Sequence, residues 1–301
     1  MKIVKIKGGL GNQLFQYAFA RLIQAKTGEE VKIDMFSLID RKKDSNQKSV
    51  LFSVFVPRLF KMNLALSSAE TCDIAEVCRF RHRGDPRTLI YKAGILFEYL
   101  LNPNYYFEKN RGYVDPSKIQ KYSYFDGYWQ SWRYVDEILP RIQNELQPKS
   151  PLHDSTLRMI DEVSGVNSVF MGVRKGDYSN SKRHFGVFTN DYYQKAMRYI
   201  AEHVENPVFY VFSNDISWVK NNIDFAGKTV IFREPEDVVD DFEDLFIMAS
   251  CRHSIIINST YHWWGARLNN RPDKIVVAPE KWFFDDSPIN IIPPYWVRLK
   301  P

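Results

Sequence analysis

Short apolar strands alternate with helices along most of the chain, and this alternation limits the fold more than any other feature of the sequence. In the second half, the apolar patterns predict strands at 168–173, 207–213, 229–232, 254–257 and 274–278, with helices at 190–204, 216–222, 241–251 and 261–269. Strands separated by helices of this length form a parallel sheet with helices on both faces. This half is therefore predicted to be a doubly wound α/β domain.

The first half opens in the same way. A strand at 2–7, a helix at 12–26 and a strand at 31–34 make a βαβ unit, and a strand at 123–129 with a helix at 131–146 closes this half. Residues 147–151 are polar and include two prolines, which is typical of a linker. We expect a Rossmann-like domain over 1–150 and a second over 151–301, with a ligand cleft between the two domains. The C-terminal tail of the second domain could pack back against the first.

A glycine-rich turn, KGGLGNQLFQ, connects the first strand to the first helix. Gly9 and Gly11 let the backbone approach an anion, and Asn12 and Gln13 add amide donors at the helix start. A dinucleotide fingerprint would need a third glycine where Leu14 stands. Two readings stay open, a phosphate-binding turn and a plain strand-to-helix connection.

Polar residues follow three strands of the second half, at one predicted edge of its sheet. They are Arg174, Lys175 and Asp177 after the first strand, Ser213, Asn214 and Asp215 after the second, and Asn258, Ser259 and Thr260 after the fourth. A guanidinium can hold two phosphate oxygens, and a helix start attracts anions. The alternatives are a surface ion pair and helix caps. Trp263 and Trp264 are predicted to be core residues, and a lone histidine such as His262 is usually structural.

Composition narrows the class of ligand. The net charge of +5, from 41 basic and 36 acidic residues, suits an anionic ligand but is too small to indicate nucleic acid by itself. The three cysteines have no metal-ligand spacing and are expected to be reduced thiols. We expect a cytoplasmic protein without a signal peptide or an apolar run of the ~20 residues needed to span a membrane. Peripheral association with the inner face of the membrane stays open.

Four segments together are similar to one known family. KGGLGNQLFQYAFA, VRKGDY, FSNDISWVKNN and DLFIMASCRHSIIINSTYHWWGARL resemble, in order and spacing, the bacterial α-1,2-fucosyltransferases of glycosyltransferase family 11. GYWQSWRYV, at residues 127–135, also looks like a segment of that family. The resemblance covers nearly the whole chain, with 37–121 the vaguest part.

The resemblance implies a GT-B-like fold and a galactoside 2-α-L-fucosyltransferase. Such an enzyme moves L-fucose from GDP-β-L-fucose to the 2-hydroxyl of a galactose in an oligosaccharide, with inversion and without a metal or other cofactor. It implies that Arg174 contacts the donor diphosphate, that Asn12 faces the β-phosphate and fucose, and that Asp244 faces the guanine. In the family's His-x-Arg-Arg-Gly-Asp pattern, this chain has Gly172 for the histidine and Lys175 for the second arginine.

The mechanism and three other readings remain open at this stage. Asp34, Asp126 and Asp177 lie at or near predicted strand ends and are candidate bases, unless the leaving phosphate takes the proton. Another GDP-sugar or another acceptor linkage is an alternative within the same class. An NAD-dependent oxidoreductase, suggested by the opening βαβ unit, and a non-catalytic nucleic-acid binder, suggested by the basic stretch 79–87, are alternatives from other classes. The acceptor and the oligomeric state are not given by the sequence.

Overall fold

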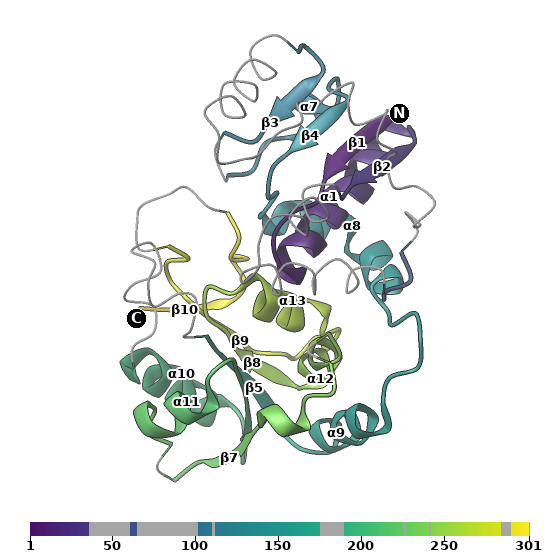
Figure 1. Ribbon diagram of the computed structural model, residues 1–301. Coiled ribbons are helices and arrows are strands. Elements are labelled where there is room, and N and C mark those ends of the chain that lie inside the picture. Colours follow the sequence, from purple (N-terminus) through teal and green to yellow (C-terminus); the bar gives the residue numbers. More distant parts are fainter. Residues whose placement is uncertain are drawn as a thin grey trace, which may run out of the picture. The chain divides into compact units, whose positions relative to one another are not determined.

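The fold is taken from a computed structural model, which divides into two compact units (Figure 1). The N-terminal unit contains Met1–Ser150 and Pro288–Ile291, and the C-terminal unit contains Pro151–Ser287 and Ile292–Pro301. The structure describes residues 1–35, 61–64, 102–109, 112–174, 190–225, 227–240, 242–283 and 290–300. Both units are α/β with all-parallel sheets, so the predicted α/β, doubly wound fold class is confirmed.

The sheet of the N-terminal unit has the strand order β2-β1-β4-β3. Its strands are β1 (Lys2–Lys5), β2 (Val31–Asp34), β3 (Tyr105–Phe107) and β4 (Tyr124–Asp126). The helices are α1 (Leu10–Thr27), α7 (Pro116–Ile119) and α8 (Trp132–Glu145). Strand β2 has its predicted bounds, β1 and β4 are shorter than predicted, and β3 and α7 were not predicted.

Helix α1 forms the centre of the N-terminal core. Phe19 stacks on Trp129 at 3.8 Å between ring centroids and meets the edge of Phe125 at 5.5 Å. The helix ends at Gly28, whose φ of 69° is the left-handed conformation that glycine adopts readily. Of the helices the structure describes, none has the length and apolarity needed to span a bilayer.

The C-terminal sheet has six strands in the order β10-β9-β8-β5-β6-β7. They are β5 (Ser168–Val173), β6 (Val208–Ser213), β7 (Thr229–Phe232), β8 (His253–Ile255), β9 (Val276–Pro279) and β10 (Val297–Leu299). The five strands predicted here are confirmed, with β5 and β7 at their predicted bounds. Strand β10 was not predicted.

Helices cover both faces of the C-terminal sheet (Figure 1). They are α9 (Asp154–Gly165), α10 (Asn190–His203), α11 (Ile216–Asn222), α12 (Asp244–Ser250) and α13 (Thr260–Leu268). Val169, Met171 and Val173 of β5 pack in one apolar cluster with residues of α10 and α11. Because side chains alternate along a strand, Phe170 and Gly172 belong to the opposite face, where α12 and α13 lie.

A buried ionic cluster ties β1 to β4 in the N-terminal unit. The Asp126 carboxylate, in a residue only 2% exposed, accepts hydrogen bonds from Lys5 Nζ at 2.6 Å, Lys7 Nζ at 2.5 Å and the Tyr105 hydroxyl at 2.9 Å. Burial acts to raise the pKa of Asp126, but the two lysines outweigh it and hold that pKa well below its ordinary range. The carboxylate is therefore stabilised in its charged form.

We expect Asp126→Asn to destabilise the protein at neutral pH by about 3–5 kcal/mol, because it leaves two lysine ammonium groups without their carboxylate. A carboxyl group whose pKa is lowered by folding stabilises above its unfolded pKa, and this stabilisation is lost as the pH falls through lower values. The gap between wild type and variant should therefore shrink below the ordinary pKa of 3.8. Urea unfolding at neutral pH and near pH 3 measures both effects.

The matched control is Glu29→Gln. Glu29 pairs with the N-terminal amine at 3.0 Å and with Lys2 at 3.1 Å, but its side chain is 45% exposed. An exposed pair of this kind contributes about 0–1 kcal/mol. Equal losses of stability in the two variants would contradict the argument from burial.

Candidate functional site

The strand order of the C-terminal sheet changes direction between β5 and β8. The chain runs from β5 through β6 to β7 on one side and then returns through β8 and β9 to β10 on the other. In open parallel sheets, ligands bind beyond the carboxyl ends of the strands at such a switch point. Arg174 follows β5 and Asn258–Thr260 follow β8, so the structure brings these predicted residues to the switch point.

The charge of Arg174 acts on a buried histidine, His262. The pKa of His262 is lowered to about 3, first by burial and then by the charge of Arg174. The space next to Gly172, where the resemblance leads one to expect a histidine, is filled by the ring of His262, whose Nδ1 lies 2.3 Å from where a β-carbon on Gly172 would be. Sequence reasoning treated His262 as structural and did not connect it with Gly172.

Asn258 and Ser259 act differently at the start of α13. Ser259 caps the helix, because its side chain accepts a hydrogen bond from His262 N at 3.5 Å. Asn258 is 2% exposed, and within the described part of the chain neither its Oδ1 nor its Nδ2 has a hydrogen-bond partner. A buried amide without partners is costly, so Asn258 marks a place where a water molecule or a ligand is needed. Thr260 is the first residue of the helix.

The residues at the end of β6 and directly after it form a local helix cap. Ser213 Oγ accepts a hydrogen bond from Asp215 N at 3.0 Å, and Asp215 Oδ1 accepts one from Trp218 N at 2.9 Å in the first turn of α11. Asn214 is exposed between them. The cap that was left open as an alternative is therefore present for Ser213 and Asp215.

Asp244, at the start of α12, is paired with a buried arginine. Its Oδ1 accepts a hydrogen bond from Arg233 Nε at 3.0 Å, and each of the two residues is 7% exposed. Arg233 follows β7 and was not singled out in the sequence. Its Nη2 is buried and has no hydrogen-bond partner in the described residues. The pair places one carboxylate and one guanidinium near the carboxyl end of β7.

The carboxyl ends of β1 and β4 are neighbours in the parallel N-terminal sheet. The glycine-rich turn follows β1, and a loop of residues 127–131 follows β4. The two are joined by a hydrogen bond that Gln130 Nε2 donates to Asn12 Oδ1 at 2.7 Å. Gln130 was missed in the sequence, although a polar residue inside the aromatic stretch YWQSW was the available signal.

Backbone geometry fixes the glycine-rich turn. Gly8 has a φ of +81°, and a β-carbon there would lie 2.6 Å from Asn12 Nδ2. Gly9 is the N-cap residue of α1, and its carbonyl accepts hydrogen bonds from Asn12 N and Gln13 N. Gln13 Nε2 donates to Gly8 O at 2.9 Å, and Gly11 is buried in the first turn of the helix. These contacts involve Gly9, Asn12 and Gln13, and Gly11 lies with Asn12 and Gln13 in the first turn of the helix.

A second glutamine braces the same region. Gln16 Oε1 accepts from Lys7 N at 2.8 Å, and its Nε2 donates to Gly127 O at 3.1 Å. It therefore connects the backbone after β1 to the backbone after β4. Its spacing from Asn12, one helical turn away, gave no sign of this role in the sequence.

The candidate bases differ in what they contact. Asp126 is held by Lys5 and Lys7, which lower its pKa and make it a weak base. Asp34, fully buried at the end of β2, accepts a hydrogen bond from the Tyr124 hydroxyl. Asp177 and Lys175 lie outside the described residues. Among the described residues, no group of three or more His, Cys, Asp or Glu side chains is arranged to hold a metal ion.

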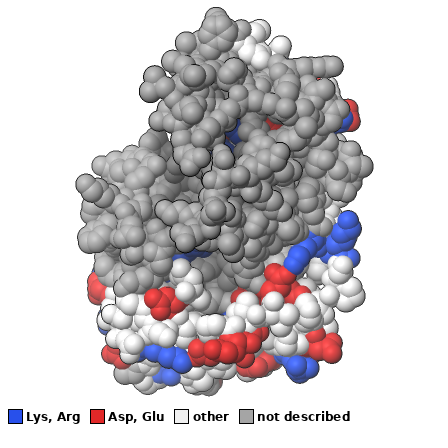
Figure 2. Space-filling view, viewed as in Figure 1, with Lys and Arg blue, Asp and Glu red and all other residues white. Residues whose placement is uncertain are grey.

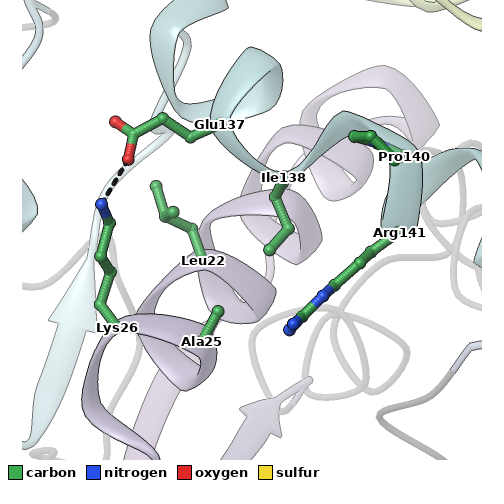
Figure 3. Close-up of a pocket in the computed structure, with 7 residues that line it drawn as sticks. All are labelled: Leu22, Ala25, Lys26, Glu137, Ile138, Pro140 and Arg141. Carbon is green, nitrogen blue, oxygen red and sulfur yellow. Dashed lines mark ion pairs between the residues drawn. The ribbon is translucent and has the colours of Figure 1, made fainter.

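A surface pocket of about 350 Å³ lies between α1 and α8 in the N-terminal unit (Figure 3). Leu22, Ala25 and Lys26 of α1 line one side, and the Lys26 ammonium pairs with Glu137 of α8 at 2.7 Å. These residues belong to the C-terminal end of α1, whereas the glycine-rich turn is at its N-terminal end. The pocket is therefore separate from the candidate site.

The sequence as a whole matches one family. A profile of Glycosyl transferase family 11 matches residues 1–299. The chain belongs to glycosyltransferase family 11. The predicted resemblance is thereby confirmed at the level of the family, and transfer of a sugar is favoured over the oxidoreductase and nucleic-acid-binding alternatives.

Figure 2 shows acidic and basic side chains interspersed over the described part of one face.

This family 11 transferase has relatives of known activity. It is 31% identical to the O-antigen biosynthesis glycosyltransferase WbnK of Escherichia coli, over 98% of this chain and 99% of that protein. It is 29% identical to an alpha-1,2-colitosyltransferase of Escherichia coli, over 99% of this chain and 98% of that protein. A galactoside alpha-(1,2)-fucosyltransferase 1 of Ateles belzebuth is 28% identical over 47% of this chain and 42% of that protein.

We expect Gly8→Ala to cost more stability than Gly28→Ala. Both glycines have a left-handed φ, which costs a residue with a β-carbon about 1–2 kcal/mol. A β-carbon at Gly28 meets nothing within 4 Å, whereas one at Gly8 meets the Asn12 amide and should break its hydrogen bond with Gln130, at a further ~1 kcal/mol. Urea unfolding of both variants measures the difference.

The same comparison in a Gln130→Ala background tests the cause. If Gly8→Ala acts through the Asn12–Gln130 hydrogen bond, its excess cost over Gly28→Ala should disappear when Gln130 is already absent. An excess that persists in this background would show that the bond is not the reason.

Proposed function

We propose that this family 11 transferase moves L-fucose from GDP-β-L-fucose to the 2-hydroxyl of a galactose in an oligosaccharide, with inversion at the anomeric carbon. The observation that carries the proposal is the position of Arg174, directly after β5 at the switch point of the C-terminal sheet. A cation placed there suits a nucleotide diphosphate. The α-1,2 linkage in the names of the colitosyltransferase and the galactoside fucosyltransferase supports the choice of the 2-hydroxyl.

The chemical demand is to stabilise a leaving group. When the bond between the sugar and GDP breaks, negative charge grows on the β-phosphate while the sugar gains oxocarbenium character. Fixed cations and N–H dipoles meet such a charge without having to reorganise during the reaction. We assign this task to Arg174 and the N-terminus of α13, both in the C-terminal unit. With these groups in place, no metal is required.

The acceptor hydroxyl must lose a proton as it attacks. Asp126 is a poor base, since Lys5 and Lys7 hold its pKa well below its ordinary range. Asp34, Asp177 and the departing phosphate are the remaining acceptors for this proton. A base is most effective when its pKa lies near the working pH, so the weakly basic Asp126 is better suited to holding β1 and β4 together.

One of the relatives supports an alternative sugar donor. The alpha-1,2-colitosyltransferase is as similar to this chain, within two percentage points of identity, as the O-antigen glycosyltransferase WbnK. Colitose is fucose without its 3-hydroxyl group, so one pocket can be shaped for either sugar. The alternative donor is therefore GDP-colitose, with the same nucleotide and the same groups around the diphosphate.

We expect GDP-fucose to be used with galactosides, and the product to carry an α-1,2 linkage. The assay incubates the full chain with GDP-fucose or GDP-colitose and a panel of galactosides, and identifies the product by mass and linkage. UDP-galactose is the matched control donor, and each reaction is run with and without EDTA. If only GDP-colitose supports transfer, the proposed donor is wrong. If the sugar is transferred to another hydroxyl, the proposed α-1,2 linkage is wrong. Loss of activity in EDTA with recovery in Mn²⁺ would contradict the metal-free mechanism.

We expect Arg174→Ala to lower kcat by about 10²–10³-fold, because one preorganised donor to a developing anion is lost. The charge on the diphosphate is larger in the transition state than in the bound donor, so the loss should appear mainly in kcat and less in KM. Arg174→Lys should recover only part of the activity, since an ammonium cannot make a two-pronged contact. Steady-state kinetics with circular dichroism as a folding check measures this, and a folded Arg174→Ala enzyme with normal kcat would refute the assignment.

A further inference from the structure

Gly172 and His262 occupy one space. A β-carbon built on Gly172 would lie 2.3 Å from Nδ1, 2.5 Å from Cγ and 2.7 Å from Cε1 of the His262 ring. Three ring atoms within such distances mean that the edge of the imidazole rests on the backbone of β5, in the place where any side chain at residue 172 would begin. Only glycine at this position allows the ring to lie there.

Arg174 comes directly after Val173, the last residue of β5, and two residues after Gly172. Continuing the alternation of β5 by one residue puts Arg174 on the side of the sheet where the His262 ring lies. The charge of Arg174 is felt by the ring, because it is one of the two causes that lower the pKa of His262. The imidazole is therefore neutral at physiological pH and adds no repulsive charge next to the guanidinium.

The position of the His262 ring is fixed by the surroundings of α13. His262 lies in the first turn of α13, its backbone N–H donates to Ser259 Oγ, and its neighbours Trp263 and Trp264 are fully buried. The residue itself is 6% exposed, and among the residues that the structure describes its Nδ1 has no hydrogen-bond partner. The His262 side chain is tightly packed and uncharged, and its Nδ1 makes no hydrogen bond to the described residues. We therefore expect it to affect its neighbours by the space that the ring occupies.

We propose that His262 is a positioning residue: its neutral ring, seated on Gly172, is a wall that fixes the guanidinium of Arg174 for the donor diphosphate. The proposal rests on the proposed function in that it takes the ligand of Arg174 to be the diphosphate of a GDP-sugar. Gly172 then has a defined task, which is to leave room for a ring that comes from another element. The site gains an imidazole beside Arg174 without a histidine on β5.

The test uses the full chain and two single variants with a matched control. Gly172→Ala should lower Tm and weaken GDP binding, because the new methyl group displaces the ring. Gly165→Ala is the control, since a β-carbon at Gly165 in the same unit meets nothing within 4 Å. His262→Ser removes the wall and should lower kcat, by up to about 100-fold, since a catalytic group misplaced by about 1 Å can cost that much.

Two double variants separate packing from positioning. Gly172→Ala/His262→Ser should recover the Tm lost in Gly172→Ala, because the clash is gone, while kcat stays low. Gly172→His/His262→Ser returns an imidazole from the strand side and should recover most of the lost kcat. A purely structural role predicts that Tm and kcat recover together in the first double variant, and that result would overturn the proposal.

Other outcomes are equally decisive. The proposal is wrong if Gly172→Ala behaves like Gly165→Ala, or if His262→Ser keeps wild-type kcat and GDP affinity. If the strand-side histidine does not fold, the kcat and GDP affinity of His262→Ser decide alone. GDP affinity by calorimetry and Tm are measured without any acceptor, so a wild-type enzyme that transfers no fucose would refute the proposed function, and GDP affinity would then take the place of kcat in the comparison of the variants.

Discussion

The Asp126 carboxylate, buried between two lysine ammonium groups, is the interaction on which the N-terminal unit depends. Lys5 ends β1 and Asp126 ends β4, so their ion pair joins the carboxyl ends of two strands that are 121 residues apart. The glycine-rich turn and the loop after β4 both start from these ends. The hydrogen bonds of Gln130 with Asn12 and of Gln16 with Lys7 N and Gly127 O connect the same two segments further along.

The C-terminal unit reaches a similar arrangement by different means. Its central strand β5 is buried along its whole length, with β6 on one side and β8 on the other. Alternate side chains of β5 pack in an apolar cluster with α10 and α11, and the polar groups are gathered beyond the strand ends. The contrast is informative: buried Asp126 stabilises the N-terminal sheet, while at the corresponding edge of the C-terminal sheet Asn258 lacks hydrogen-bond partners within the described residues. Groups left in that condition are better explained by a ligand than by stability.

The sequence predicted the elements well wherever the apolar pattern was long enough to repeat. Strands β2, β5 and β7 and helix α11 have the predicted bounds, because each is determined by its own residues and those next to it. The three-residue strands β3 and β10 were missed, whereas β4 and β8, which are equally short, lie within the longer aromatic or apolar stretches 123–129 and 253–257 and were predicted. Helix α9 was missed although it spans 12 residues, and only two of them, Thr156 and Val163, are buried.

Part of the candidate site could be predicted because its residues directly follow strands. Arg174, Asn12 and Asn258 follow strands, and a parallel sheet gathers strand ends at one edge. The helix caps of Ser213 and Asp215 are local, so they could be named as an alternative but not chosen. The partnerships of Asn12 with Gln130, Asp244 with Arg233, and Gly172 with His262 join elements that only the folded chain brings together. A resemblance to a family could point to one member of each pair but not to its partner.

The division of the chain has a consequence for its covalent connectivity. The chain leaves the N-terminal unit after Ser150, returns to it for Pro288–Ile291 and leaves again, so the two units share three junctions and neither is one continuous segment. Within the short return, Asn290 O accepts a hydrogen bond from Trp132 N at 3.0 Å. Cutting the polypeptide at residue 287 would therefore remove this bond from the start of α8 and also take β10 from the edge of the other sheet, leaving β9 with an open edge. The last fourteen residues thus complete both halves of the protein at once.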